Sequence, residues 1–209
     1  MNDTDVDRLV KHLRATVGTD LPEWPGGWPG EIECALLDAV FSIRARYGGP
    51  TSGVRAVVNR WIAHRGGAAD DLKQLAAVSG SEIALVVDNY AKANSRLKAD
   101  IVSDAAAALL DAGVRSSGDF TGSSEQKAAY LSTTGCGPVT WAYFGMLLGR
   151  PDVKADTWLL RFVRGAIQRP TTSPEETRQL VITAAEIYGV SASRLDHAIW
   201  RHARNTSAL

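Results

Sequence analysis

Cysteine is scarce in this sequence: among 209 residues, only Cys34 and Cys136 carry a thiol. Two such cysteines do not make a disulfide framework, and they cannot supply the four thiolates that an iron–sulfur cluster requires. The histidines do not provide another metal site, because His197 and His202 are five positions apart and no carboxylate or thiol pattern joins them. The sequence therefore predicts no metal and no cofactor, and the free thiols fit a reducing cytoplasm.

Long hydrophobic runs and net charge are also missing. No segment approaches the roughly 18 apolar residues that a membrane helix needs, and the charged first residues do not read as a signal peptide. We therefore expect a cytoplasmic protein with no membrane partner. Lys plus Arg number 23, as do Asp plus Glu, so the formal charge at pH 7 is zero. This balance disfavours a nucleic-acid partner unless the basic residues gather on one face, and a solvated surface is the commoner explanation for scattered charges.

Helical periodicity, by contrast, is present along most of the chain. Apolar residues recur at three- and four-residue spacing in segments separated by Gly and Pro, and no segment alternates as a strand would. Ser123 and Ser173 are each followed three positions later by Gln126 or Glu176, a capping-box pattern that marks helix starts. The sequence predicts an all-α protein of about ten helices with short connections.

Residues 132–163 carry most of the functional information. Gly135 and Gly137 flank Cys136 in a turn that we expect to be too tight for most side chains, and Pro138 suits the first position of a helix. Such a turn leaves backbone N–H groups unpaired at the positive end of a helix dipole, where phosphate binds. Asp156 precedes the next apolar helical run and is placed to cap it. The segment therefore predicts a phosphate-binding turn followed, one helix later, by an anion.

These residues resemble the helix-hairpin-helix motif of the endonuclease III-like (HhH-GPD) DNA glycosylase superfamily. GCGPVTWA corresponds to the pattern LPGhGxKTA of that family, in which h is apolar, and ADTWLLRFV corresponds to VDTHhxRV. The resemblance puts Asp156 at the catalytic aspartate. It also implies that the hairpin binds DNA through Gly135, Cys136, Gly137, Val139 and Thr140.

Weaker similarities extend from residue 32 to residue 204. ECALLDAVFSIRARY resembles an early helix that ends in LLSAQ, which puts Arg44 where a glutamine wedges into the duplex. Tyr47 and Tyr90 are candidates to stack on the flipped base in its pocket. The resemblance implies two helical lobes with a cleft between them: residues 32–149 as a six-helix lobe with the hairpin, and residues 1–31 plus 150–209 as the second.

Two departures from the family pattern define the expected activity. Members that also cut the DNA backbone carry a lysine in GxGxK, where this chain has Val139, and valine cannot form a Schiff base. Many members carry a four-cysteine iron–sulfur cluster, which this chain cannot build. The resemblance therefore implies a monofunctional glycosylase of base excision repair. This hydrolase, a monomer in the cytoplasm at the nucleoid, would flip a damaged or modified base out of double-stranded DNA and hydrolyse its N-glycosidic bond with Asp156.

Two other interpretations stay open at this stage. An Asp before a helix is most often only an N-cap, so the chain is alternatively a non-catalytic helix-hairpin-helix DNA-binding protein. More remotely, the glycines merely join two helices in a protein-interaction domain. The family's alanine two positions after the lysine is Trp141 here, a further change in the hairpin.

Overall fold

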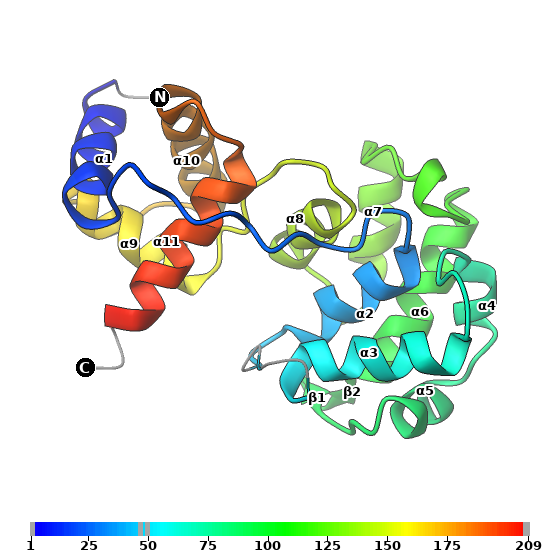
Figure 1. Cartoon of the computed structure of the whole chain (residues 1–209). Coiled ribbons are helices and arrows are strands. Elements are labelled where there is room, and N and C mark those ends of the chain that lie inside the picture. Colours follow the sequence, from blue (N-terminus) through cyan, green and yellow to red (C-terminus); the bar gives the residue numbers. More distant parts are fainter. Residues whose placement is uncertain (1–2, 46–47, 49–50, 207–209) are drawn as a thin grey trace. The chain divides into compact units, whose positions relative to one another are not determined.

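The computed structural model describes residues 3–45, 48 and 51–206, and it confirms the all-α prediction (Figure 1). The expectation that the chain contains no strand is wrong, because β1 (Lys92–Ala93) and β2 (Arg96–Leu97) form a short antiparallel pair. Asn94 and Ser95 between them adopt φ values of 49° and 71°, the left-handed conformations of a two-residue hairpin turn. Two-residue strands are too short for periodicity to reveal.

The chain divides into two compact units. We call Gly27–Gly149 the central unit, and Met1–Gly26 with Arg150–Leu209 the terminal unit. In the described part of the chain, every helix is too short or too polar to cross a lipid bilayer.

The central unit is built around α2 (Ile32–Phe41), in which every residue is buried. Such a helix belongs in the middle of a core, and α2 packs against α3, α6 and α8. The other helices of this unit are α3 (Gly53–Arg65), α4 (Leu72–Ala76), α5 (Gly80–Val86), α6 (Lys98–Asp111), the 3-10 turn η1 (Ser117–Asp119), α7 (Ser124–Ser132) and α8 (Pro138–Leu147).

The apolar spacing predicts one helix over residues 72–77 that ends before Gly80 and another over residues 81–90, but the second helix is shorter and starts earlier. Gly80, which we expected to stop the preceding helix, is the first residue of α5, because Ser79 and Glu82 form a reciprocal capping box there. Asp88 then adopts a φ of 46°, which a helix does not accommodate, so α5 has already ended at Val86. Helix starts encoded by a local cap thus override the expectation that a glycine terminates a helix.

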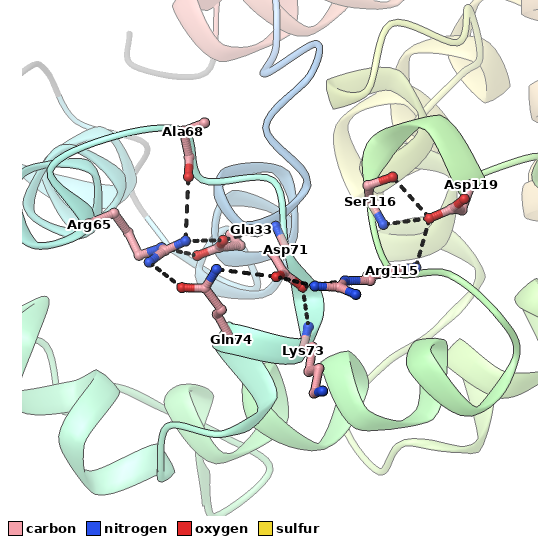
Figure 2. A network of polar contacts seen from close by, with 9 residues as sticks. All are labelled: Glu33, Arg65, Ala68, Asp71, Lys73, Gln74, Arg115, Ser116 and Asp119. Carbon is pink, nitrogen blue, oxygen red and sulfur yellow. Dashed lines mark hydrogen bonds and ion pairs between the residues drawn. The ribbon is translucent and has the colours of Figure 1, made fainter.

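A buried carboxylate joins three helices of the central unit. The Glu33 side chain of α2 is fully buried and accepts hydrogen bonds from Trp61 Nε1 (2.8 Å), Arg65 Nε (2.9 Å) and the Asp71 backbone N–H (3.0 Å). Figure 2 shows the network around it, in which Asp71 caps α4 and also binds the guanidinium of Arg115. Hydrogen bonds from Arg115 lower the pKa of Asp71 to about 2. The ends of α2, α3 and α4 are therefore held together by one acid.

The terminal unit is a bundle of four helices around a separate apolar core. Its helices are α1 (Asp3–Thr16), α9 (Thr157–Ile167), α10 (Pro174–Tyr188) and α11 (Ala192–Thr206). The core includes Leu9 and Leu13 from α1, Leu159 and Val163 from α9, and Ile199 from α11, each at most 1% exposed. Because this core draws on both ends of the sequence, α1 completes a unit whose other helices follow residue 150.

Candidate functional site

The predicted hairpin is present as the connection between α7 and α8 in the central unit. Gly135 adopts a φ of 111°, and a Cβ placed there would lie 2.5 Å from Ile101 Cδ1 of α6. Both the backbone conformation and the nearby side chain therefore favour glycine at this position. The prediction that this part of the turn is too tight for other residues is confirmed.

Gly137 is different, and the same expectation is wrong for it. Its backbone is extended, with φ −153° and ψ 172°, and a Cβ there would meet nothing within 4 Å. The fold by itself therefore does not require glycine at the N-cap of α8.

The first turn of α8 offers unpaired backbone donors. Pro138 occupies the N1 position as predicted. The Thr140 hydroxyl accepts from the Gly137 N–H (3.0 Å) and donates to the Gly137 carbonyl (2.9 Å), so this side chain caps the helix. Within the described residues, the backbone N–H groups of Val139 and Thr140 donate to no acceptor. Two amide donors and the positive end of the helix dipole therefore coincide here, which is the arrangement that binds phosphate.

Aromatic side chains support the hairpin from the protein interior. Trp141, at the position of the alanine in the motif that the hairpin resembles, is buried, with its ring centroid 5.4 Å from Tyr130 of α7 and 5.1 Å from Phe120. The bulky residue therefore fills the core behind the turn. Cys136 is partly exposed, and burial raises the pKa of its thiol to about 11. The thiol is thus protonated at neutral pH and is a poor nucleophile.

Arg96 also holds the hairpin, although no sequence motif indicates this role. Its Nη1 donates to the Thr134 carbonyl at 2.8 Å, and its Nη2 pairs with Asp104 of α6. Arg96 reaches Thr134 from β2, a strand that the sequence pattern does not reveal. No local signal identifies this contact.

Arg44, the predicted wedge, is exposed in the turn that follows α2. It adopts a φ of 50°, so the chain reverses there rather than continuing the helix. Lys98, which is 3% exposed, fixes this turn from α6, since its Nζ donates to the carbonyls of Phe41 (2.9 Å) and Ile43 (2.7 Å). Burial lowers the pKa of Lys98. A buried lysine thus takes the place of the missing helical hydrogen bonds at the end of α2.

Of the two tyrosines predicted to stack on a flipped base, the structure describes only Tyr90. Tyr90 lies between α5 and β1 with 57% of its surface exposed, so its ring is open to solvent on the central unit. Tyr47 lies outside the described residues.

Asp156 caps α9 in the terminal unit, as predicted. Its Oδ1 accepts from the backbone N–H groups of Trp158 (2.8 Å) and Leu159 (3.2 Å). Its Oδ2 accepts no hydrogen bond from any described residue, and the side chain is only half-buried. One oxygen is therefore fixed by the helix, and the other is available to a ligand.

No group of three or more His, Cys, Asp or Glu side chains among the described residues is arranged to hold a metal ion. The polar groups that the sequence singled out for chemistry are the hairpin amides and the Asp156 carboxylate. They belong to different units of the fold, the hairpin to the central unit and Asp156 to the terminal unit.

Comparison with known proteins supports the fold. Residues 7–204 match the model of a family described as "Domain of unknown function (DUF8548)". The solved structure described as "Structure of a thermostable thymine-DNA glycosylase" has a TM-score of 0.60 and 15% identity, covering 94% of this chain and 87% of its own. "Structure of MBOgg1 in complex with low affinity DNA ligand" has a TM-score of 0.59 and 15% identity, covering 85% of this chain.

The present chain spans only 61% of the MBOgg1 chain. A search of curated proteins finds no match. At 15% identity, the two solved structures establish a shared all-α fold of the kind that the resemblance implies.

Proposed function

The chain belongs to the family described as Domain of unknown function (DUF8548), and we propose that it is a DNA glycosylase. The proposed reaction is hydrolysis of the N-glycosidic bond of a damaged or modified base that has been flipped out of double-stranded DNA. The observation that carries this proposal is the Asp156 carboxylate, of which one oxygen is held by α9 and the other accepts no hydrogen bond from the residues that the structure describes. The glycosylase-like fold of the chain supports it.

Asp156 suits the chemistry of this reaction. Breaking the N-glycosidic bond builds positive charge on the sugar near C1′, and a nearby carboxylate either stabilises that charge or deprotonates a water molecule. The two amides of α9 hold Oδ1, and this contact restricts the direction in which Oδ2 points. A carboxylate oriented in advance loses less freedom when the transition state forms.

The hairpin would hold the DNA backbone. We propose that the amides of Val139 and Thr140 at the start of α8, which donate to no acceptor among the described residues, bind a phosphate, with Gly135 and Cys136 forming the turn and Gly137 allowing close approach. Arg44 would enter the duplex from its exposed turn, and Tyr90 and Tyr47 would stack on the base. The expected complex contains one copy of the protein and one duplex.

The proposed enzyme is monofunctional. Val139 occupies the position at which the endonuclease III-like glycosylases with lyase activity carry a nucleophilic lysine. The valine side chain cannot attack the sugar. The thiol of Cys136, with a pKa of about 11, is not a substitute. Water would therefore be the nucleophile, and the DNA strand would stay intact after base release.

Base release from a panel of duplexes tests the proposal. The panel contains a G·T mismatch, a G·U mismatch, 8-oxoguanine, hypoxanthine or 3-methyladenine in an otherwise identical sequence. We expect one class of base to be released, with strand cleavage only after alkali treatment. Salt-sensitive duplex binding without any release would favour a non-catalytic DNA-binding protein. Absence of duplex binding would favour a protein-interaction domain, and strand cleavage without alkali would show lyase activity.

The two hairpin glycines provide a matched test of the phosphate site. Gly137→Ala should fold like the wild type, because no described residue beyond its chain neighbours lies within 4 Å of the added Cβ, but should weaken duplex binding by roughly tenfold, or about 1.4 kcal/mol. The added methyl group would stand between the helix start and the phosphate. Duplex binding is measured by fluorescence anisotropy at fixed salt concentration.

Gly135→Ala is the control for the fold. Its positive φ and its contact with Ile101 should lower stability by about 1–3 kcal/mol, seen as a lower melting temperature. Wild-type duplex affinity in Gly137→Ala would contradict the proposed role of α8.

A further inference from the structure

The segment that leads into Asp156 is held by α11. Residues 152–156 contain no helix, and the side chains of Val153 and Ala155 are buried at 0% and 5% exposure. The backbone N–H of Asp152 donates to Ser193 Oγ (3.2 Å), and that of Lys154 donates to Asp196 Oδ1 (3.1 Å). Ser193 and Asp196 are three positions apart and therefore share one face of α11. Two alternate backbone amides of the segment thus bind one helix face.

The Lys154 residue connects this contact to Asp156. Its N–H is bound by Asp196, and its carbonyl accepts from the Asp156 N–H at 2.6 Å. The Asp156 side chain then accepts hydrogen bonds from the first amides of α9. Through its two hydrogen bonds, Lys154 alone links the Asp196 carboxyl to the Asp156 backbone. Displacement of the Lys154 amide would therefore move Asp156 as well.

Asp196 is a costly residue to bury at this position. It is 6% exposed, and burial, followed by the nearby charge of Asp156, raises its pKa well above the ordinary value. An asparagine would accept the same hydrogen bond from Lys154 without a titrating group. What Asp196 contributes here is therefore the hydrogen bond that it accepts from the Lys154 N–H, rather than a negative charge.

We propose that Asp196 is a positioning residue of the glycosylase reaction: it holds the Lys154 amide and thereby fixes the backbone from which Asp156 reaches the sugar. This inference rests on the proposed function of Asp156. Asp196 itself need not touch the DNA, and its effect would appear in the rate of base release rather than in DNA affinity.

Single-turnover kinetics with the full chain test this role, on the panel duplex that the wild type processes best. Asp196→Ala should slow base release by about 100-fold, the scale expected when a reacting group is misplaced by about 1 Å. Its affinity for a duplex with a tetrahydrofuran abasic-site analogue should be unchanged. Asp196→Asn should recover most of the rate because its amide oxygen accepts from Lys154. Ser103→Ala, which removes a side-chain hydrogen bond to the Val78 carbonyl (3.1 Å) in the central unit, is the control and should stay close to the wild-type rate.

A double-mutant cycle separates positioning from general destabilisation. In the Asp156→Asn background, Asp196→Ala should cause no further loss of rate, since the group that it positions is already gone. If Asp196→Ala does not fold, Asp196→Ser, whose side chain is too short to reach Lys154, repeats the measurement.

Each failure points to a different hypothesis. A wild-type rate in Asp196→Ala, with Asp156→Asn inactive, would overturn the role of Asp196 and leave the proposed function standing. Equal losses in Asp196→Ala and Asp196→Asn would also overturn it, because the hydrogen bond would then not be what matters. Absence of base release by the wild type would instead reject the proposed function.

Discussion

Asp156→Asn is expected to lose nearly all base release while leaving binding to abasic-site DNA intact. Asparagine is as good an N-cap as aspartate, so α9 should still start where it does, with the amide oxygen accepting from Trp158 and Leu159. The amide carries no negative charge, however, and can neither stabilise a developing positive charge nor deprotonate water. A loss on the order of a hundredfold to a thousandfold or more is expected, as for other groups that stabilise transition-state charge.

The measurement is a single-turnover time course on the duplex that the wild type processes best. Asp71→Asn is the matched control, because Asp71 also caps a helix through Oδ1, which accepts from the Lys73 N–H at 3.0 Å. It lies in the central unit and has no proposed role in the chemistry, so its rate should equal that of the wild type. Full activity in Asp156→Asn would show that Asp156 serves only as the N-cap of α9. Loss of abasic-site binding together with activity would indicate a structural role.

Glu33→Ala is expected to produce the largest loss of stability. Its removal would leave the Arg65 guanidinium, the Trp61 indole N–H and the Asp71 amide without their shared acceptor, and the Arg65 side chain is only 18% exposed. Breaking a buried ion pair by removing one partner costs about 3–5 kcal/mol. That is a large fraction of the roughly 5–15 kcal/mol that stabilises a typical domain. The value is obtained from urea unfolding followed by circular dichroism.

Arg115→Ala is the control at the exposed edge of the same network. Arg115 pairs with Asp71 at 3.1 Å, but its side chain is 64% exposed, and exposed pairs contribute at most about 1 kcal/mol. We therefore expect Arg115→Ala to unfold close to the wild-type midpoint. A similar small effect in Glu33→Ala would show that the central unit does not depend on this carboxylate.

Several features of the proposed site are local, and the sequence predicts them. Asp156 and Ser173 cap α9 and α10, and Pro138 stands at the first position of α8. A cap depends only on contacts between a residue and the amides two or three positions later, so chain order determines it. The same holds for the recurrence of apolar residues at three- and four-residue spacing, which predicts the helices themselves.

The space around each hairpin glycine depends on distant parts of the chain. This explains why the predicted steric restriction is found at Gly135 but not at Gly137. The need for Gly135 depends partly on Ile101 of α6, 34 positions earlier in the printed sequence, whereas nothing in the fold faces Gly137. A GxG pattern alone cannot distinguish a glycine required by the fold from one that leaves space for a ligand.

The sequence by itself determined the all-α class, the starts of α7, α8, α9 and α10, the hairpin and the N-cap position of Asp156, because each follows from contacts within a few residues. Tertiary structure alone decided which side chains support these features. Lys98 reaches Phe41 across 57 positions, Arg96 reaches Thr134 across 38, and Asp196 reaches Lys154 across 42. Such contacts depend on how helices pack, and packing is set by the sum of many apolar contacts, so no short pattern announces them.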